Sequence, residues 1–284
     1  MSGTPGLRSG TPVRDALQGA ITAIGAAGCE TPRLDAEVLL AHVLGVRRER
    51  LIVDPDLEVS GLAVPAYRDA VRRRSVLREP VAYITGVKGF RQIELHVDQR
   101  VLIPRPETEL LVEAGLELPQ GACVLDLCTG SGAVALALAE ERPDLEVWGG
   151  DISPDALAVA RANGERLGLP VSWLQADLLE GVPDRFDTLL ANPPYVSLAE
   201  LALLQPEIAR HEPRLALAAG EDGLAAIRPL LAQAATRSRL RSLALEVGAG
   251  QAEAVAAIAR ETGFPQASVT CDLAGIERVV RASR

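Results

Sequence analysis

The chain has 284 residues, of which 48% are hydrophobic and 24% charged, and its formal net charge is −9. This composition excludes wholesale disorder. No run of 18 apolar residues occurs, and the first ten residues lack an apolar stretch, so we expect neither a membrane span nor a secretory signal. The four cysteines stand apart, without a C-x-x-C pair or a nearby histidine, which argues against a disulfide framework and a metal site. These features predict a cytoplasmic protein.

The charge is unevenly distributed along the chain. Residues 1–88 carry 12 basic and 10 acidic side chains, whereas the remaining residues carry 17 basic and 28 acidic ones. An acidic body repels nucleic-acid backbones unless a basic stripe compensates, and the one such stripe surrounds Arg72-Arg73-Arg74. Lys88 is the only lysine, and no G-x-x-x-x-G-K-[ST] sequence is present, which argues against lysine Schiff-base chemistry and a P-loop. We expect no direct nucleic-acid partner.

Residues 1–80 are predicted to form a small all-α domain. The signals are amphipathic stretches with helix-start and helix-stop residues: Thr11-Pro12 before a helix over 13–24, Thr31-Pro32 before a second helix that Gly45 ends, and a third stretch over 64–77. We see no cluster of catalytic residue types among them.

Residues 81–105 are predicted to form a β-hairpin linker. Ile93, Leu95 and Val97 alternate with polar residues, and an apolar run follows at 101–103. Pro104-Arg105-Pro106 then stiffens the backbone and starts a helix over 107–118.

Residues 106–284 alternate between apolar strands and helices. Strands are predicted at 122–127, 145–150, 171–175, 186–191, 240–247, 267–271 and 277–281, and helices at 132–141, 154–167, 224–235 and 252–262. Continuous apolar strands separated by helices indicate a doubly wound, mostly parallel α/β sheet that is covered on both faces. Ligands of such sheets bind at the carboxyl ends of the strands.

A nucleoside pocket is predicted at that edge of the sheet. The first strand leads into a glycine-containing loop before a helix, where the backbone can approach a ligand closely. Asp151 ends the second strand, where a carboxylate can accept hydrogen bonds from both ribose hydroxyls. Asp177 follows the third strand, in a position to meet an adenine edge. The candidate cofactor-binding residues are Cys128, Thr129, Gly130, Ser131, Gly132, Asp151, Asp177, Leu178 and Asn192.

The same loop also satisfies the dinucleotide fingerprint G-x-G-x-x-[G/A] through Gly130, Gly132 and Ala135. Considered alone, it leaves open a nicotinamide-dependent dehydrogenase or a turn without a ligand. The fourth strand argues against both.

That strand ends in Asn192-Pro193-Pro194-Tyr195. The two prolines fix the backbone and remove two N–H donors, which leaves carbonyl oxygens as acceptors. An –NH2 group on a planar carbonyl or ring fits this arrangement. Its hydrogens can go to Asn192 Oδ1 and the Pro193 carbonyl, while its plane stacks on Tyr195. We therefore expect Asn192, Pro193, Pro194 and Tyr195 to bind the substrate, and Asn192, Pro193 and Tyr195 to act in catalysis.

With these motifs the chain resembles class I S-adenosylmethionine-dependent methyltransferases that act on a planar amino nitrogen, and among them the release-factor glutamine methyltransferases (the PrmC/HemK family). The discriminating stretch is Ile-Pro-Arg-Pro-Glu-Thr-Glu at 103–109, since methyltransferases of DNA and RNA amino groups share Asn-Pro-Pro-Tyr. The resemblance also covers 79–86 and Glu277-Arg278-Val279.

The resemblance implies a seven-stranded methyltransferase sheet. It also implies methylation of the glutamine side-chain amide (N5) in the Gly-Gly-Gln motif of class I peptide chain release factors, with S-adenosylhomocysteine as product. The helical domain is implied to help recognise the factor, and we expect a monomer. One residue departs from the family pattern, because Cys128 replaces the usual first glycine of the loop. We expect its backbone to keep a negative φ.

Two other functions stay open at this point. The first is an amino-group methyltransferase for adenine or guanine in DNA or RNA, which needs base flipping and a basic surface. The acidic second part of the chain argues against it. The second is a non-catalytic module that binds a nucleoside and docks a protein. The segment Asn192–Tyr195 argues against it, because a module that only binds does not need these acceptors.

Overall fold

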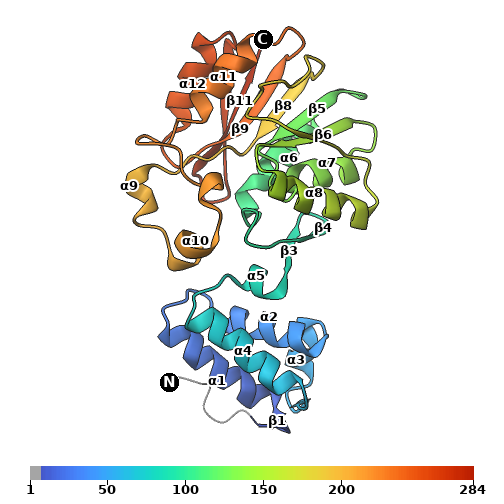
Figure 1. Cartoon of the computed structure of the whole chain (residues 1–284), viewed down its shortest axis with the longest axis vertical. Coiled ribbons are helices and arrows are strands. Elements are labelled where there is room, and N and C mark those ends of the chain that lie inside the picture. The colour runs from blue at the N-terminus through green and yellow to red at the C-terminus, as the bar shows by residue number, and fades with distance from the viewer. Residues whose placement is uncertain (1–7) are drawn as a thin grey trace. The chain divides into compact units, whose positions relative to one another are not determined.

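The computed structural model describes residues 8–284, which fold into two compact units (Figure 1). Segment 1–7, where we expect no secretory signal, lies outside the described residues. The first unit contains the described residues up to Gly86 together with Gln205–His211. The second contains Val87–Leu204 and Glu212–Arg284. Within residues 8–284, no helix is long and apolar enough to cross a membrane.

The first unit is mostly helical, as predicted. Its elements are β1 (Thr11–Pro12), α1 (Val13–Ala26), α2 (Pro32–Leu44), α3 (Arg48–Val53), β2 (Glu58–Val59), α4 (Ala63–Ser75), α5 (Val81–Thr85) and α10 (Pro206–His211). Thr11 and Pro12 precede the first helix as expected, and they also pair with β2.

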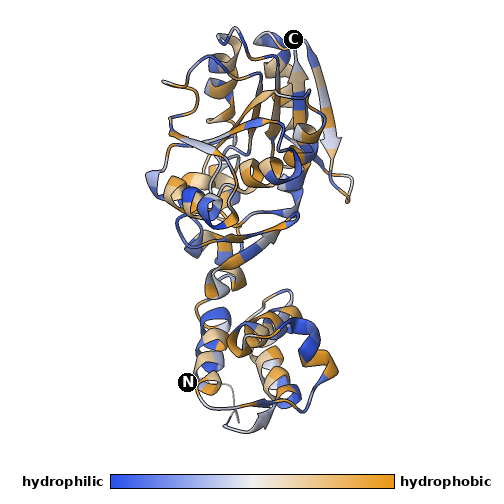
Figure 2. Cartoon of the chain, turned by 90° about the vertical axis from the view of Figure 1, so that its right-hand side faces the viewer, coloured by the Kyte–Doolittle hydropathy of each residue, from blue (hydrophilic) through white to orange (hydrophobic). Residues whose placement is uncertain are grey.

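Residues at its two ends determine where α2 begins and stops, and packing against the other helices determines which side of it is buried. Pro32 opens the helix, and Gly45 ends it at φ +63°, a conformation that glycine adopts without strain. The helices of this unit carry both hydrophobic and hydrophilic residues (Figure 2). Their apolar sides surround Tyr67, which is fully buried and donates its hydroxyl to the Ala36 carbonyl over 3.1 Å.

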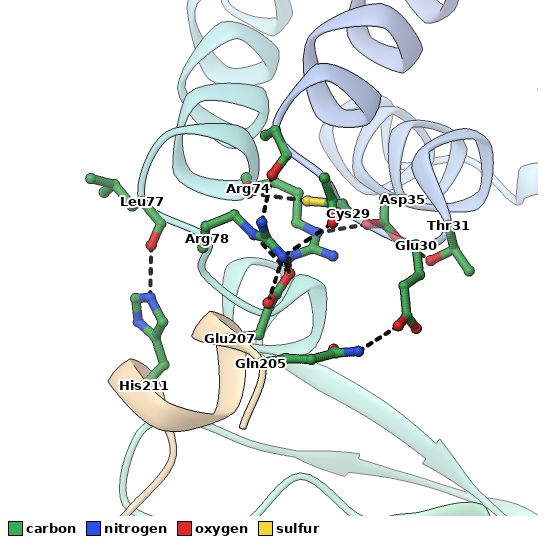
Figure 3. Close-up of polar contacts among 12 residues, drawn as sticks. Cys29, Glu30, Thr31, Asp35, Arg74, Leu77, Arg78, Gln205, Glu207 and His211 are labelled. Carbon is green, nitrogen blue, oxygen red and sulfur yellow. Dashed lines mark hydrogen bonds and ion pairs between the residues drawn. The ribbon is translucent and has the colours of Figure 1, made fainter. Parts of the chain in front are cut away.

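A buried ion cluster joins segment 205–211 to the helices of the first unit. Figure 3 shows the Glu207 carboxylate facing the guanidinium groups of Arg74 and Arg78. Arg74 donates to Glu207 over 2.6 Å and to Asp35 over 2.6 Å, and Arg78 donates to Glu207 over 2.9 Å. The chain thus leaves the second unit after Leu204 and returns at Glu212.

The second unit contains the sheet and its covering helices. Its strands are β3 (Val87–Phe90), β4 (Ile93–His96), β5 (Cys123–Leu127), β6 (Glu146–Asp151), β7 (Ser172–Gln175), β8 (Thr188–Ala191), β9 (Ser242–Glu246), β10 (Gln266–Cys271) and β11 (Glu277–Ser283). Its helices are η1 (Pro106–Thr108), α6 (Glu109–Leu116), α7 (Ala133–Glu141), α8 (Pro154–Leu167), α9 (Leu198–Leu201), η2 (Arg214–Ala216), α11 (Ile227–Ala235) and α12 (Ala252–Glu261).

Seven strands form one sheet in the order β10-β11-β9-β8-β5-β6-β7. The five strands β5 to β9 are parallel, and β11 and β10 add to β9 antiparallel. Apolar residues of α11 and α12 share one core with alternate residues of β5, while α6 and α7 cover the opposite face near Leu190. The prediction of a mostly parallel, doubly wound, seven-stranded sheet is confirmed. The strand order reverses between β5 and β8, which is where such sheets bind ligands.

Residues 81–106 differ in part from the prediction. The hairpin forms, because β3 pairs antiparallel with β4, and Phe90 and Ile93 alternate with exposed residues. Residues 81–85, however, form helix α5, and the apolar run 101–103 lies outside any strand. The helix expected over 107–118 is divided into η1 and α6.

Candidate functional site

A cavity of about 490 Å³ opens at the carboxyl ends of the parallel strands. Nine of the residues proposed from the sequence line it: Cys128, Thr129, Gly130, Ser131, Asp151, Asp177, Leu178, Asn192 and Pro194. The other three, Gly132, Pro193 and Tyr195, are not among the lining residues. The sheet thus brings together loops from four strands at one binding space. Its volume lies in the range of small-molecule sites.

The loop after β5 is held open by left-handed backbone conformations. Gly130 has φ +55°, and no atom lies within 4 Å of where a Cβ on it would stand, so space above this backbone is free. Gly132 has φ +84° at the start of α7, and a Cβ there would stand 2.9 Å from Trp173 Cη2. These positions require glycine for different reasons, ligand approach at the first and packing at the second.

Cys128 corrects our expectation of a negative φ. Its φ is +59°, so the residue adopts the conformation for which the family's glycine is suited, although it carries a side chain. Leu178 is also left-handed, at φ +51°. Both residues line the cavity, and strained backbone of this kind concentrates at ligand sites. Burial, together with Asp151, raises the pKa of the Cys128 thiol, so it stays protonated near neutral pH.

Asp151, the last residue of β6, links this strand to the glycine loop after β5. Its Oδ2 accepts the Gly130 N–H over 2.9 Å, and its Oδ1 accepts the Ser153 N–H over 2.9 Å. Burial raises the pKa of this carboxyl, and the backbone N–H groups of Ser153, Gly130 and Ile152 partly offset that effect. A carboxylate offers about four acceptor sites, which exceeds these three donors, so it can still accept a hydroxyl donor from a ligand in the cavity.

Asp126 is a further functional candidate, to which the sequence alone assigned no role. It is 2% exposed, and its Oδ2 accepts the Thr129 hydroxyl over 2.5 Å and the Ala135 N–H over 3.1 Å. The carboxyl therefore braces the loop against the first turn of α7. Burial raises its pKa to about 7, and Thr129 and Ala135 act in the opposite direction. The sequence contains a signal for this residue: Asp126 is the one acid in the apolar strand 123–127, and acids are rarely buried in such strands.

The Asn-Pro-Pro-Tyr segment is hydrogen-bonded to Thr108 and Glu246, neither of which was predicted as a site residue. The Asn192 Nδ2 donates to Thr108 Oγ1 over 3.2 Å, which leaves Oδ1 free as an acceptor. The Tyr195 hydroxyl donates to Glu246 Oε1 over 3.1 Å. Glu246 ends β9 and is 1% exposed. The sequence indicates this residue in the same way as Asp126, because it is a lone acid in an apolar strand.

One wall of the cavity comes from residues 213–218. Glu212, just before this wall, accepts Arg105 Nη2 over 2.6 Å. Burial raises the pKa of Glu212, and Arg105 offsets part of this effect. The ion pair therefore anchors the wall to the Pro-Arg-Pro stretch.

Two known protein families match parts of this chain. Residues 15–86 match the PrmC N-terminal domain, and residues 106–216 match the methyltransferase small domain. A release factor glutamine methyltransferase from Deinococcus radiodurans is 41% identical over 96% of this chain and 98% of the relative. One from Mycolicibacterium smegmatis is 40% identical over 96% of this chain and 98% of the relative.

A solved structure shares the fold at much lower identity. The catalytic domain of human Mettl16, determined in complex with an RNA hairpin, is 15% identical, with a TM-score of 0.57 over 77% of this chain and 81% of that one. The similarity concerns the architecture of the methyltransferase sheet. With the full-length matches at 40–41% identity, the chain belongs to the family of release factor glutamine methyltransferases.

Proposed function

We propose that this methyltransferase transfers a methyl group from S-adenosylmethionine to the side-chain amide nitrogen (N5) of the glutamine in the Gly-Gly-Gln motif of class I peptide release factors. The observation that carries the proposal is the setting of Asn192. Its side-chain nitrogen is occupied by Thr108, so its oxygen is available as an acceptor in the cavity that the glycine loop and Asp151 also line.

The residues around the cavity fit S-adenosylmethionine as cofactor. Asp151 and Asp177 supply acceptors for hydroxyl and amino groups, and Ile152, Leu178 and Ala225 supply apolar surface for a planar base. The open space above Gly130 suits a ligand that lies close to the backbone. We assign Cys128–Gly132, Asp151, Asp177, Leu178 and Asn192 to holding the cofactor. Cys128 contributes through its backbone.

When bound, S-adenosylmethionine supplies an electrophilic methyl group on a sulfonium sulfur. An amide nitrogen is a weak nucleophile, because its lone pair is delocalised into the carbonyl, so the protein's task is mainly positioning. Asn192 Oδ1 and the Pro193 carbonyl accept the two N–H hydrogens and stabilise the positive charge that grows on nitrogen, the reverse of an oxyanion hole. Tyr195 holds the plane of the amide by stacking, and the displaced proton leaves to water.

We assign residues 1–80 to recognition of the release factor, residues 81–105 to the linker and residues 106–284 to methyl transfer. The match of residues 15–86 to the PrmC N-terminal domain supports the first assignment. The proposal includes a cytoplasmic, monomeric enzyme that binds no nucleic acid directly. The acidic balance of residues 89–284 supports the last point.

The test is transfer of labelled methyl from S-adenosylmethionine to three acceptors offered side by side: purified class I release factor, duplex DNA and ribosomal RNA. We expect label on the release factor alone. Label on nucleic acid without label on the factor overturns the proposal in favour of an adenine or guanine amino-group methyltransferase. The absence of transfer to any acceptor, with cofactor bound, favours a non-catalytic binding module.

A further inference from the structure

Gln251 forms two hydrogen bonds that tie the Asn-Pro-Pro-Tyr segment to the turn after β9. It stands just before α12, and its side chain is partly buried. The side-chain Oε1 accepts the Gly248 N–H over 2.9 Å, and Nε2 donates to the Tyr195 carbonyl over 3.0 Å. A backbone N–H can only donate and a carbonyl can only accept, so these two partners fix the orientation of the amide. The side chain thus connects the segments that follow the neighbouring strands β8 and β9.

Two glycines make room for this contact. At Gly223, which has φ +76°, a Cβ would stand 2.3 Å from Gln251 Nε2 and 2.4 Å from the Tyr195 carbonyl oxygen. At Gly248 a Cβ would stand 3.0 Å from Gln251 Oε1 and 3.3 Å from Tyr195 Cδ2. Because interiors are close-packed, a side chain at position 223 would displace one of the two bonded groups. Three loops therefore converge on the contact between Gln251 and Tyr195, with no room for a further methyl group.

The Asn-Pro-Pro-Tyr segment needs an anchor at its far end. Its first residue, Asn192, directly follows β8, so the strand holds that end. The two prolines have no N–H, so they donate no backbone hydrogen bond that could fix the path of the chain. Beyond them Tyr195 is held twice, at its carbonyl by Gln251 and at its hydroxyl by Glu246 over 3.1 Å. The path of the segment, and with it the direction of the Pro193 carbonyl, is therefore set from both ends.

From these contacts we infer that Gln251 is a positioning residue for methyl transfer, which holds the Tyr195 backbone so that the acceptors earlier in the segment point at the substrate –NH2. The inference rests on the proposed function, because it concerns the acceptors assigned there, Asn192 Oδ1 and the Pro193 carbonyl. Gln251 is not among the residues that line the cavity, so it acts through the segment and not on the ligand. A displacement of about 1 Å at the reacting groups can lower a rate roughly 100-fold.

Gln251→Glu removes the donor and keeps the length and shape of the side chain. The ionised carboxylate can still accept the Gly248 N–H, but its second oxygen faces the Tyr195 carbonyl with no hydrogen between them. We expect turnover on the release factor at pH 8 to fall roughly 10–100-fold. Binding of S-adenosylhomocysteine, measured by calorimetry, should stay within about threefold of the natural value, because the residues that line the cavity are unchanged. Gln266→Glu, at an exposed position of β10, adds the same charge and should behave as the natural protein.

The pH profile separates the lost hydrogen bond from a general structural defect. In Gln251→Glu the protonated side chain can donate to the Tyr195 carbonyl while its other oxygen accepts the Gly248 N–H. Turnover of this variant relative to the natural protein should therefore rise as the pH falls from about 8 to about 5. Glu246 titrates in both proteins, so its effect cancels in this ratio. Gln251→Met has a similar length but no donor, and its relative turnover should stay low throughout.

Natural turnover in Gln251→Glu at pH 8 overturns the inference, and so does the same pH profile for Gln251→Glu and Gln251→Met. Loss of S-adenosylhomocysteine binding together with turnover also overturns it, because Gln251 then supports the fold as a whole and not the segment. A natural protein that methylates no release factor refutes the proposed function instead, so the two failures are distinguishable.

Discussion

Asp151 Oδ2 accepts the backbone N–H of Gly130 over 2.9 Å. This hydrogen bond ties the end of β6 to the glycine loop that follows β5. This bond places a carboxylate and an open stretch of backbone on the same wall of the cavity. A single side chain therefore shapes the loop and offers acceptors to a ligand.

Asp151→Ala should weaken S-adenosylmethionine binding by roughly 10–100-fold, since charge-assisted hydrogen bonds contribute about 1.5–3 kcal/mol. Calorimetric titration of the purified variant measures the dissociation constant. Glu165→Ala, at an exposed position on α8, is the control and should bind as the natural protein does. A dissociation constant of Asp151→Ala within twofold of the natural value would place the ribose away from this carboxyl.

Cys128→Gly should stabilise the apo protein by about 1 kcal/mol, because the residue has φ +59° and the left-handed conformation costs non-glycine residues about 1–2 kcal/mol. Lost packing and the greater chain entropy of glycine offset part of the gain. Urea unfolding measures the change. The same substitution at Cys271, on strand β10 without a positive φ, should instead destabilise the protein. A loss of stability at both positions would contradict the strain at Cys128.

Asp126→Asn should flatten the dependence of stability on pH. The folded-state pKa of Asp126 is about 7, above the usual value of about 3.9, so the folded protein binds the extra proton between these limits. The free energy of unfolding therefore decreases as the pH rises from about 4 to 7. Asparagine can accept the Thr129 and Ala135 bonds through its oxygen and does not titrate. Urea midpoints at pH 5 and pH 8 provide the measurement, and parallel changes in the two proteins would refute the expectation.

Glu207→Ala should destabilise the first unit by about 3–5 kcal/mol, because it removes the carboxylate that the buried Arg74 shares with the half-buried Arg78. Hydrogen exchange of peptides from α2 and α4 should accelerate accordingly. Glu253→Ala removes a loose ion pair to Arg260, with the glutamate 86% exposed, and should change exchange little. Unchanged protection in α2 and α4 would mean that the cluster contributes little.

The sequence predicted the sheet well because its strands are continuous apolar runs. The first strand was expected at 122–127 and spans Cys123–Leu127, and the helix expected at 154–167 has those limits. Short segments were harder: residues 81–85 belong to a helix, since Gly86 can end a single turn at φ +75°.

The remaining features depend on contacts that local patterns do not encode. The ion pair of Arg74 with Glu207 joins residues 133 positions apart. The hydrogen bond of Asn192 to Thr108 spans 84 positions. The left-handed backbone at Cys128 runs against the preference of its residue type, so residue identity alone predicted the wrong sign of φ.

The most direct test of the proposed function is to locate the transferred methyl group. The natural protein is incubated with S-adenosylmethionine and a class I release factor, and the factor is mapped by peptide mass spectrometry beside a reaction with Asn192→Ala. We expect one added methyl group, on the glutamine side chain of the Gly-Gly-Gln motif, and a rate lower by roughly 10²–10³-fold with the variant. A methyl group on any other residue, or equal rates for the two proteins, would contradict the proposed function.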